Sequence, residues 1–153
     1  MIIIGIDPGL NGGIAVMGDV VCGGIAAFKF ETIATIQDLL EKILDENDAS
    51  NIKAFVEDPP VFFKGAGGGL ASQAKLHRNY GEYLGILMGL RIPFEIVTPQ
   101  KWQKGLPGLQ KLTGKDRKAA LYNLAKERFP QAKPTLKTCD AMLIAEYGKK
   151  VTL

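Results

Sequence analysis

The sequence contains few of the residues that build disulfide scaffolds or zinc sites. Its 153 residues include two cysteines, Cys22 and Cys139, and a single histidine, so neither a disulfide framework nor a Cys/His zinc site is indicated. No apolar run is long enough to cross a bilayer, and no basic segment precedes the first apolar run as it would in a signal peptide. We therefore expect free thiols, a reducing compartment and no membrane partner.

Acidic residues are scarce in the last third of the chain. Residues 101–153 contain 12 Lys/Arg and 4 Asp/Glu, whereas residues 1–100 contain 7 Lys/Arg and 12 Asp/Glu. The formal charges of the two parts are therefore +8 and −5, which together give the +3 of the whole chain. This asymmetry favours a polyanionic partner for the C-terminal third, with nucleic acid as the leading candidate. A solvated lysine-rich surface is the alternative.

The length fits a single domain over residues 1–153. Apolar runs predict strands over residues 1–7, 14–17, 20–28, 52–56 and 94–97, with Gly18-Asp19 as a two-residue hairpin turn. Helical periodicity predicts helices over residues 32–44, from the glycine-rich loop 65–69 to about residue 90, and at roughly 114–128 and 138–147. Three strands followed by alternating helices and strands predict an α/β domain, with a mixed five-stranded sheet flanked by helices.

Two of the predicted strands end in a carboxylate. Asp7 follows the first strand and Glu57 the fourth, so both acids lie at one edge of the sheet if these strands are neighbours. Asp140 is expected in the first turn of the last helix, behind Thr138 as N-cap. Each acid alone fits an ordinary surface or helix-start position. Together, three converging carboxylates repel one another unless cations lie between them.

Mg²⁺ and Mn²⁺ suit such a set of oxygen ligands. Two such ions about 3.5–4 Å apart can activate a water and stabilise the leaving oxygen in phosphodiester hydrolysis. Lysines around the acids would hold the nucleic acid. The combination indicates a metal-dependent nuclease.

The motifs Gly5-Ile6-Asp7-Pro8-Gly9, Val56-Glu57 and Asp140–Ala145 resemble those of the RuvC-type Holliday-junction resolvases, a family with the ribonuclease H-like fold. The resemblance covers nearly the whole chain, and the segment Thr98–Trp102 is similar to the phage branch. It implies a homodimeric endonuclease of DNA recombination and repair that resolves Holliday junctions and related branched DNA by paired nicks. It also implies two Mg²⁺ ions, with Mn²⁺ as a substitute, and the cytoplasm of a bacterial cell or phage-infected host.

The same resemblance implies that Asp7, Glu57 and Asp140 are metal ligands. The family's fourth ligand precedes the last by three residues, and here that residue is Lys137. Asp58 or Glu146 could substitute for it, Lys137 could act through its charge, or the alignment could be shifted. Glu146 is a poor substitute, because it lies six residues past Asp140 on the helix and points elsewhere. Asp58 should face the other side of the sheet unless the two prolines that follow bend it back. Two lysines that support catalysis in the family correspond most nearly to Lys104 and Lys115, with Lys101 as a rival for the first.

The resemblance also implies an aromatic wedge for the DNA branch point in the loop after Glu57. Phe62 and Phe63 lie there, and stacking on an unpaired base is worth about 1–3 kcal/mol; at least one of them is expected to plug the core instead. Lys115 and Lys118 share a helical face that can follow a phosphate backbone. The expected DNA-binding residues are Phe62, Phe63, Lys64, Lys101, Lys104, Lys111, Lys115 and Lys118.

Three lesser features leave alternatives open. Gly81, Gly85 and Gly89 form a helical ridge that packs either on the sheet or on a second subunit, and the resemblance favours the homodimer. Cys139 is expected to be a buried small residue, with a lowered pKa at the helix start as the alternative. Trp102 is expected in the core.

Two other functions compete with the nuclease. A non-catalytic protein that binds branched DNA would explain the missing fourth acid at Lys137. An actin-like ATPase is the other, because Asp7-Pro8-Gly9 followed by Gly12-Gly13 also resembles a phosphate-binding hairpin. That fold needs two such domains.

Overall fold

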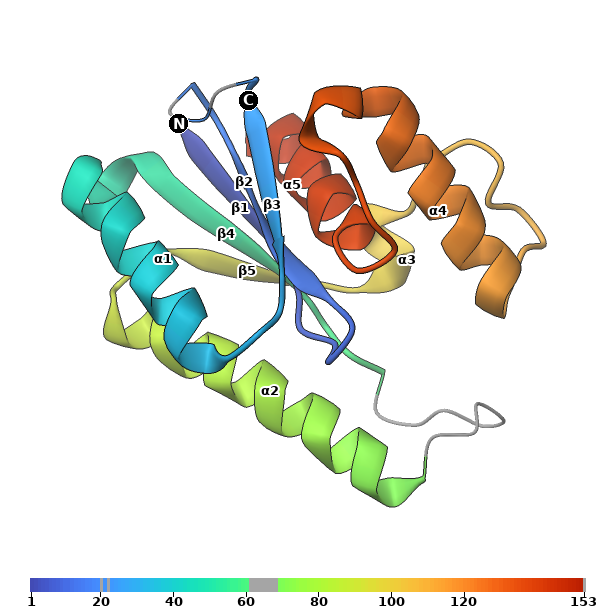
Figure 1. Ribbon diagram of the computed structural model, residues 1–153, viewed down its shortest axis with the longest axis horizontal. Helices are drawn as coiled ribbons and strands as arrows, with labels where there is room; N and C mark the ends of the chain where they lie inside the picture. Colours follow the sequence, from blue (N-terminus) through green and yellow to red (C-terminus); the bar gives the residue numbers. More distant parts are fainter. Residues whose placement is uncertain (20, 22, 61–68, 153) are drawn as a thin grey trace.

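The computed structural model describes residues 1–19, 21, 23–60 and 69–152. In this part of the chain, a five-stranded mixed sheet in the order β3-β2-β1-β4-β5 lies between two layers of helices (Figure 1). The predicted fold class is therefore confirmed. The strands are β1 (Ile2–Asp7), β2 (Gly13–Met17), β3 (Ile25–Lys29), β4 (Ile52–Glu57) and β5 (Phe94–Val97).

The helices α1 (Ile33–Glu46) and α2 (Leu70–Gly89) cover one face of the sheet. The other face is covered by α5 (Cys139–Thr152), with α4 (Gly114–Arg128) and the short α3 (Pro99–Trp102) beside it. Single 3₁₀ turns follow α1 (η1, Ala49–Asn51) and α4 (η2, Pro130–Ala132). None of the helices in the described ranges has the length and apolar character that crossing a membrane requires.

The two strands that end in acids are neighbours, a pairing that the sequence analysis left as a condition. β1 pairs in parallel with β4, and Ile6 lies opposite Val56. Asp7 and Glu57 are the next residues of the two strands, so both lie at the same edge of the sheet. The antiparallel pairing of β1 with β2 and of β2 with β3 completes the meander.

The alternation of side chains along the strands decides which face each acid takes. Ile4 and Ile6 pack in the core beneath α1 and α2, whereas Ile3 and Phe55 pack in the core beneath α5. Because side chains alternate between the faces of a sheet, Asp7 shares the α5 face with Ile3. Glu57 likewise shares the α5 face with Phe55, and the next residue in the chain turns to the opposite face.

The two-residue hairpin predicted at Gly18-Asp19 is wrong. The strand predicted over residues 20–28 begins only at Ile25, which pairs with Met17. Gly23 and Gly24 have φ angles of 79° and 80°, a left-handed conformation that strands do not use and that glycine tolerates. The N–H of Gly18 donates to the carbonyl of Gly24 at 3.0 Å, so this bond closes the connection between β2 and β3.

Gly5 lets α5 lie directly on the centre of the sheet. A Cβ atom at this position would overlap the backbone of Ala141 and Ala145, and α5 carries Asp140. This close contact therefore also fixes the height of Asp140 above the sheet.

Replacing Gly5 with Ala is expected to destabilise the fold by about 1–3 kcal/mol, because the helix must move away from the strand. Urea denaturation followed by circular dichroism measures the loss. Gly69→Ala is the control, since a Cβ there meets no atom of the described residues within 4 Å. Equal stabilities of the two variants would show that α5 does not need this contact.

Candidate active site

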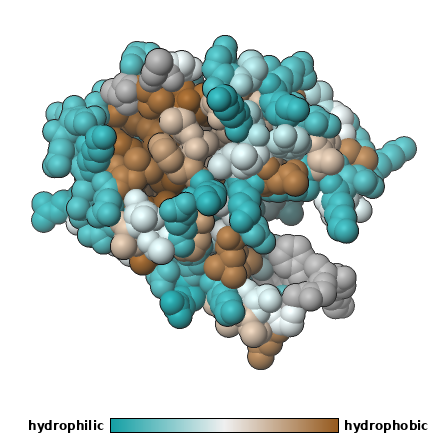
Figure 2. All heavy atoms as spheres, in the orientation of Figure 1, coloured by the Kyte–Doolittle hydropathy of each residue, from teal (hydrophilic) through white to brown (hydrophobic). Residues whose placement is uncertain are grey.

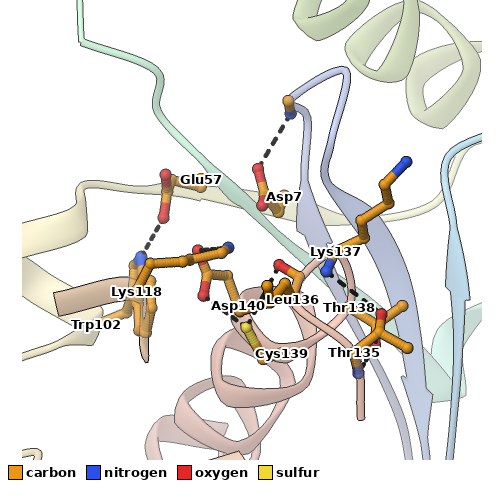
Figure 3. A network of polar contacts seen from close by, with 11 residues as sticks. Asp7, Glu57, Trp102, Lys118, Thr135, Leu136, Lys137, Thr138, Cys139 and Asp140 are labelled. Atoms are coloured by element: carbon orange, nitrogen blue, oxygen red, sulfur yellow. Dashed lines mark hydrogen bonds and ion pairs between the residues drawn. The ribbon is translucent and has the colours of Figure 1, made fainter. Parts of the chain in front are cut away.

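Three carboxylates surround one region at the edge of the sheet, as Figure 3 shows. Asp7 and Glu57 come from the ends of β1 and β4, and Asp140 from the first turn of α5. The three charges act on one another, because Asp7 and Asp140 both contribute to the raised pKa of Glu57. The structure therefore brings together the three acids that the sequence singled out.

Burial and nearby negative charge make Asp7 and Glu57 hard to ionise. Burial raises the pKa of Glu57 to about 8, and the charges of Asp7 and Asp140 add to the effect. Burial and the charge of Asp140 raise the pKa of Asp7 to about 6. Carboxylates in such a setting gain strongly from a nearby cation. An all-oxygen set of this kind suits Mg²⁺ or Mn²⁺.

Hydrogen bonds hold two of the acids in place. The N–H of Gly9 donates to Oδ1 of Asp7 at 3.0 Å, which closes the turn after β1. The indole N–H of Trp102 donates to Oε2 of Glu57 at 2.6 Å. Trp102 is buried in the core as expected, and this bond to Glu57 is a role that sequence periodicity alone did not reveal.

A buried asparagine makes a hydrogen bond to the same turn. Asn79 of α2 donates through Nδ2 to the carbonyl of Pro8 at 2.5 Å. Its Oδ1 and the hydroxyl of Tyr83, one turn further along α2, are buried without a hydrogen-bond partner among the described residues. The contact from Asn79 fixes the backbone that follows Asp7.

Lys118 is the lysine that reaches the acids. Its Nζ lies 2.6 Å from Oδ2 of Asp140, and Figure 3 shows its side chain beside that carboxylate. Burial alone would lower the pKa of Lys118, but the charge and hydrogen bond of Asp140 outweigh burial and raise it. Lys118 was expected only as a DNA contact. Its spacing of one turn from Lys115 on α4 indicated a phosphate-binding face and did not predict the contact with Asp140.

The three acids lie in one region, but their side chains are not arranged as the ligands of one metal ion. Within the described ranges, no three Asp, Glu, His or Cys side chains are arranged to hold a metal ion together. The ammonium of Lys118 is the cation that neutralises Asp140 in this arrangement. Binding of a metal ion by all three acids therefore requires their side chains to adjust.

Lys137, which stands where the sequence resemblance implies a fourth ligand, lies at the wall of the site. Lys137 and Lys118 line a cavity of about 470 Å³ together with Asp7 and the turn that follows it. Asp58 faces α2, where its carboxylate and burial raise the pKa of Tyr80. Asp58 is thus on the far face of the sheet from Asp140.

Glu146 is also engaged elsewhere. Its carboxylate pairs with Arg128 of α4 and lies 3.3 Å from Nζ of Lys150. Neither acid that the sequence offered as a substitute for Lys137 is therefore directed at the site.

The other expected site residues lie around this edge or beyond it. Lys104, Lys111 and Lys115 are exposed, and no ion pair from them is present among the described residues. Nζ of Lys101 lies 2.8 Å from Oε1 of Glu95. Phe62, Phe63 and Lys64 lie outside the described residues. The catalytic role of Lys104 and Lys115 stays a prediction.

Cys139 is buried and free, as expected. The alternative of a lowered pKa is wrong, because burial and the adjacent Asp140 raise the pKa of the thiol to about 12. Cys22 lies outside the described residues.

Comparison with known proteins identifies the architecture through structure alone. No protein-family model matches the sequence, and no curated protein matches it. The structure of Thermus thermophilus RuvC superimposes with a TM-score of 0.59 at 18% identity, covering 99% of this chain and 97% of that one. The chain has the RuvC fold.

A second solved structure supports this assignment. T. thermophilus RuvC in complex with a Holliday junction substrate gives a TM-score of 0.61 at 16% identity, covering 99% of this chain and 96% of the RuvC chain. The resemblance to RuvC-type resolvases that the motifs indicated is therefore confirmed in the fold. At these identities the likeness establishes the architecture, and activity must be argued from the site.

Proposed function

We propose that this chain is a divalent-metal-dependent endonuclease that resolves Holliday junctions and related branched DNA by paired nicks. The observation that carries the proposal is the half-buried set of Asp7, Glu57 and Asp140, which a cation would relieve of mutual repulsion. The RuvC fold over the full chain supports it, since T. thermophilus RuvC with this fold binds a Holliday junction substrate.

Asp7, Glu57 and Asp140 would hold the metal. A bound Mg²⁺ or Mn²⁺ supplies an activated water and charge stabilisation at the phosphate. Trp102 keeps one oxygen of Glu57 occupied and its carboxylate oriented. Lys118 stands next to the acids, where its charge can offset that of the phosphate in the transition state.

The DNA would lie over the basic C-terminal third. Residues 101–153 contain 12 of the 19 lysines and arginines, and Lys111, Lys115 and Lys126 are exposed on α4 or just before it. Neutralisation of phosphates by such side chains releases counterions and makes binding fall with salt. Lys118 contacts Asp140 of the site, and Lys101, Lys104, Phe62, Phe63 and Lys64 remain proposed contacts.

Labelled four-way junctions, flaps and linear duplexes, each with and without Mg²⁺, test the proposal. We expect cleavage of branched DNA that requires Mg²⁺ or Mn²⁺, and little cleavage of the duplex. The rival is a non-catalytic junction-binding protein, which the Lys118–Asp140 pair favours because a lysine already neutralises one acid. Junction binding without nicking in either metal would support the rival.

We also propose a homodimer formed through α2. Within the part of the chain that the structure describes, a Cβ at Gly81, Gly85 or Gly89 would meet no atom within 4 Å, so the glycine ridge faces away from the sheet. Figure 2 shows hydrophobic side chains at the surface in the lower part of the view, where α2 runs, and Met88 is 63% exposed. A two-fold dimer matches the two-fold symmetry of a four-way junction and would place two sites for paired nicks.

Replacing Gly85 with Arg is expected to convert this dimer into a monomer, because a long charged side chain would stand where two helices approach. Analytical ultracentrifugation measures the change. Ala34→Arg, on the exposed surface of α1, should leave the dimer intact. A wild-type chain that sediments as a monomer at high concentration would contradict the proposed assembly.

A further inference from the structure

The cavity beside Asp7 is lined by two lysines, Lys118 and Lys137, together with Asp7. The charge of Asp140 acts on Asp7, and the charges of both act on Glu57. In the view of Figure 3, Lys137 lies on the other side of Asp7 from Glu57, and Lys118 lies beside Asp140. Both ammonium groups are therefore carried by walls of the same site.

The segment that carries Lys137 is well fixed. The N–H of Lys137 donates to Oγ1 of Thr135 at 3.3 Å, and the hydroxyls of Thr135 and Thr138 lie 3.1 Å apart. α5 begins at Cys139, so the backbone at position 137 is fixed at the cavity wall. The side chain of Lys137 is itself exposed and free to turn toward a bound phosphate.

Charge balance limits how many divalent ions this site can hold. With the three acids ionised, Asp7, Glu57 and Asp140 carry three negative charges, and Lys118 and Lys137 carry two positive charges. One divalent ion and one scissile phosphate bring the total to zero. A second divalent ion would leave an excess of two positive charges in a partly buried site, where uncompensated charge is costly.

No further acid is available to compensate for a second ion. Asp58 lies on the α2 face of the sheet beside Tyr80. Glu146 is paired with Arg128 and Lys150. The described residues thus supply three carboxylates to this site, together with the two lysines.

We propose that the site binds a single divalent ion among Asp7, Glu57 and Asp140, and that the ammonium of Lys137 supplies the charge on the phosphate that a second ion would supply. This inference rests on the proposed nuclease function. It departs from the two ions that the family resemblance implied. It also gives the lysine at the fourth-ligand position a direct role toward the substrate.

Counting bound Mn²⁺ by electron paramagnetic resonance on the full chain without DNA tests the inference. We expect one ion per chain in the wild type and two in Lys137→Asp, because the added carboxylate supplies the missing ligand and removes a positive charge. Lys137→Met should keep one ion, since it removes charge without adding a ligand. Lys149→Asp, which adds an acid on exposed α5 surface, is the matched control and should also keep one.

The Mg²⁺ dependence of single-turnover junction cleavage tests whether a second ion binds only when DNA is present. We expect the wild-type rate to rise with the first power of Mg²⁺ concentration below saturation. Lys137→Met should lower the maximal rate by about 10²-fold, the effect of removing one charge-stabilising group, without weakening Mn²⁺ binding.

Two Mn²⁺ ions in the wild-type chain, or a second-power dependence on Mg²⁺, would overturn the single-ion site. A single ion in Lys137→Asp would overturn the assignment of position 137 to the missing ligand. Failure of the nuclease function gives a different result. The wild type would then bind its one ion without cutting junctions, or bind no ion at all, and the latter would overturn both proposals.

Discussion

The Asp7→Asn variant is expected to lose junction cleavage by about 10³-fold or more, as happens when a central catalytic group is removed. The amide keeps an oxygen that can accept the hydrogen bond from Gly9, so the turn after β1 should stay in place. It removes the negative charge that would hold the metal. Burial and Asp140 make that charge costly without a cation, so the variant should fold at least as stably as the wild type.

Cleavage and binding must be measured separately for this variant. Denaturing gels of labelled four-way junctions in Mg²⁺ give the rate, and gel shifts without metal give the affinity. We expect junction affinity within a few-fold of the wild type, because Asp7 repels phosphates and makes no contact that would hold them. Asp38→Asn, on the exposed surface of α1, should cleave normally. A cutting rate near that of the wild type in the Asp7 variant would remove Asp7 from the catalytic centre.

The second large effect concerns stability and pH. The pKa of Glu57 is raised from 4.5 to about 8 in the folded chain. Between pH 4.5 and 8 the folded state keeps this proton while the unfolded state loses it, so the free energy of unfolding falls as pH rises through this window. The pKa of Asp7 is raised from 3.8 to about 6. Its ionisation therefore also lowers the free energy of unfolding as pH rises, over a lower pH range than that of Glu57.

The Glu57→Gln variant is expected to lose most of this dependence. Without metal at pH 8, it should be more stable than the wild type by on the order of 3–5 kcal/mol, since each pKa unit corresponds to about 1.4 kcal/mol. Saturating Mg²⁺ should restore stability to the wild type and do little for the variant, because a ligand that binds only the folded state stabilises it. Urea denaturation at pH 5, 6.5 and 8, with EDTA or with Mg²⁺, measures both effects.

Glu127→Gln is the matched control, because Glu127 is exposed on α4. Its stability should follow that of the wild type at each pH. A wild-type chain whose stability stays level or rises from pH 5 to 8 without metal would show that Glu57 is not buried among negative charges.

The sequence predicted the elements of the fold well because their signals are local. Alternation along residues 2–7 and 52–57, and the stripe along α1, depend on neighbours within a few residues. The same alternation sends Asp7 and Glu57 to one face once β1 and β4 are paired. The failure at Gly18-Asp19 has a local cause too, since Gly23 and Gly24 were available to form a wider turn.

The choice among similar side chains could not be made from the sequence. Lys104, Lys115 and Lys118 look alike in a list of basic residues, yet Lys118 is the one that meets Asp140. Which lysine reaches an acid depends on how α4 is rotated against α5. That rotation follows from packing in the core of the α5 face, which joins residues far apart in the chain.

The sequence by itself determined that two acids end two strands, that a third begins the last helix, and that positive charge gathers toward the C-terminus. The tertiary structure decided that Asp58 and Glu146 turn away from the site, that Lys137 lines it, and that the ridge of Gly81, Gly85 and Gly89 faces outward. The reason is physical. Local periodicity sets the direction of a side chain relative to its own element, whereas its partners depend on how that element packs against the others.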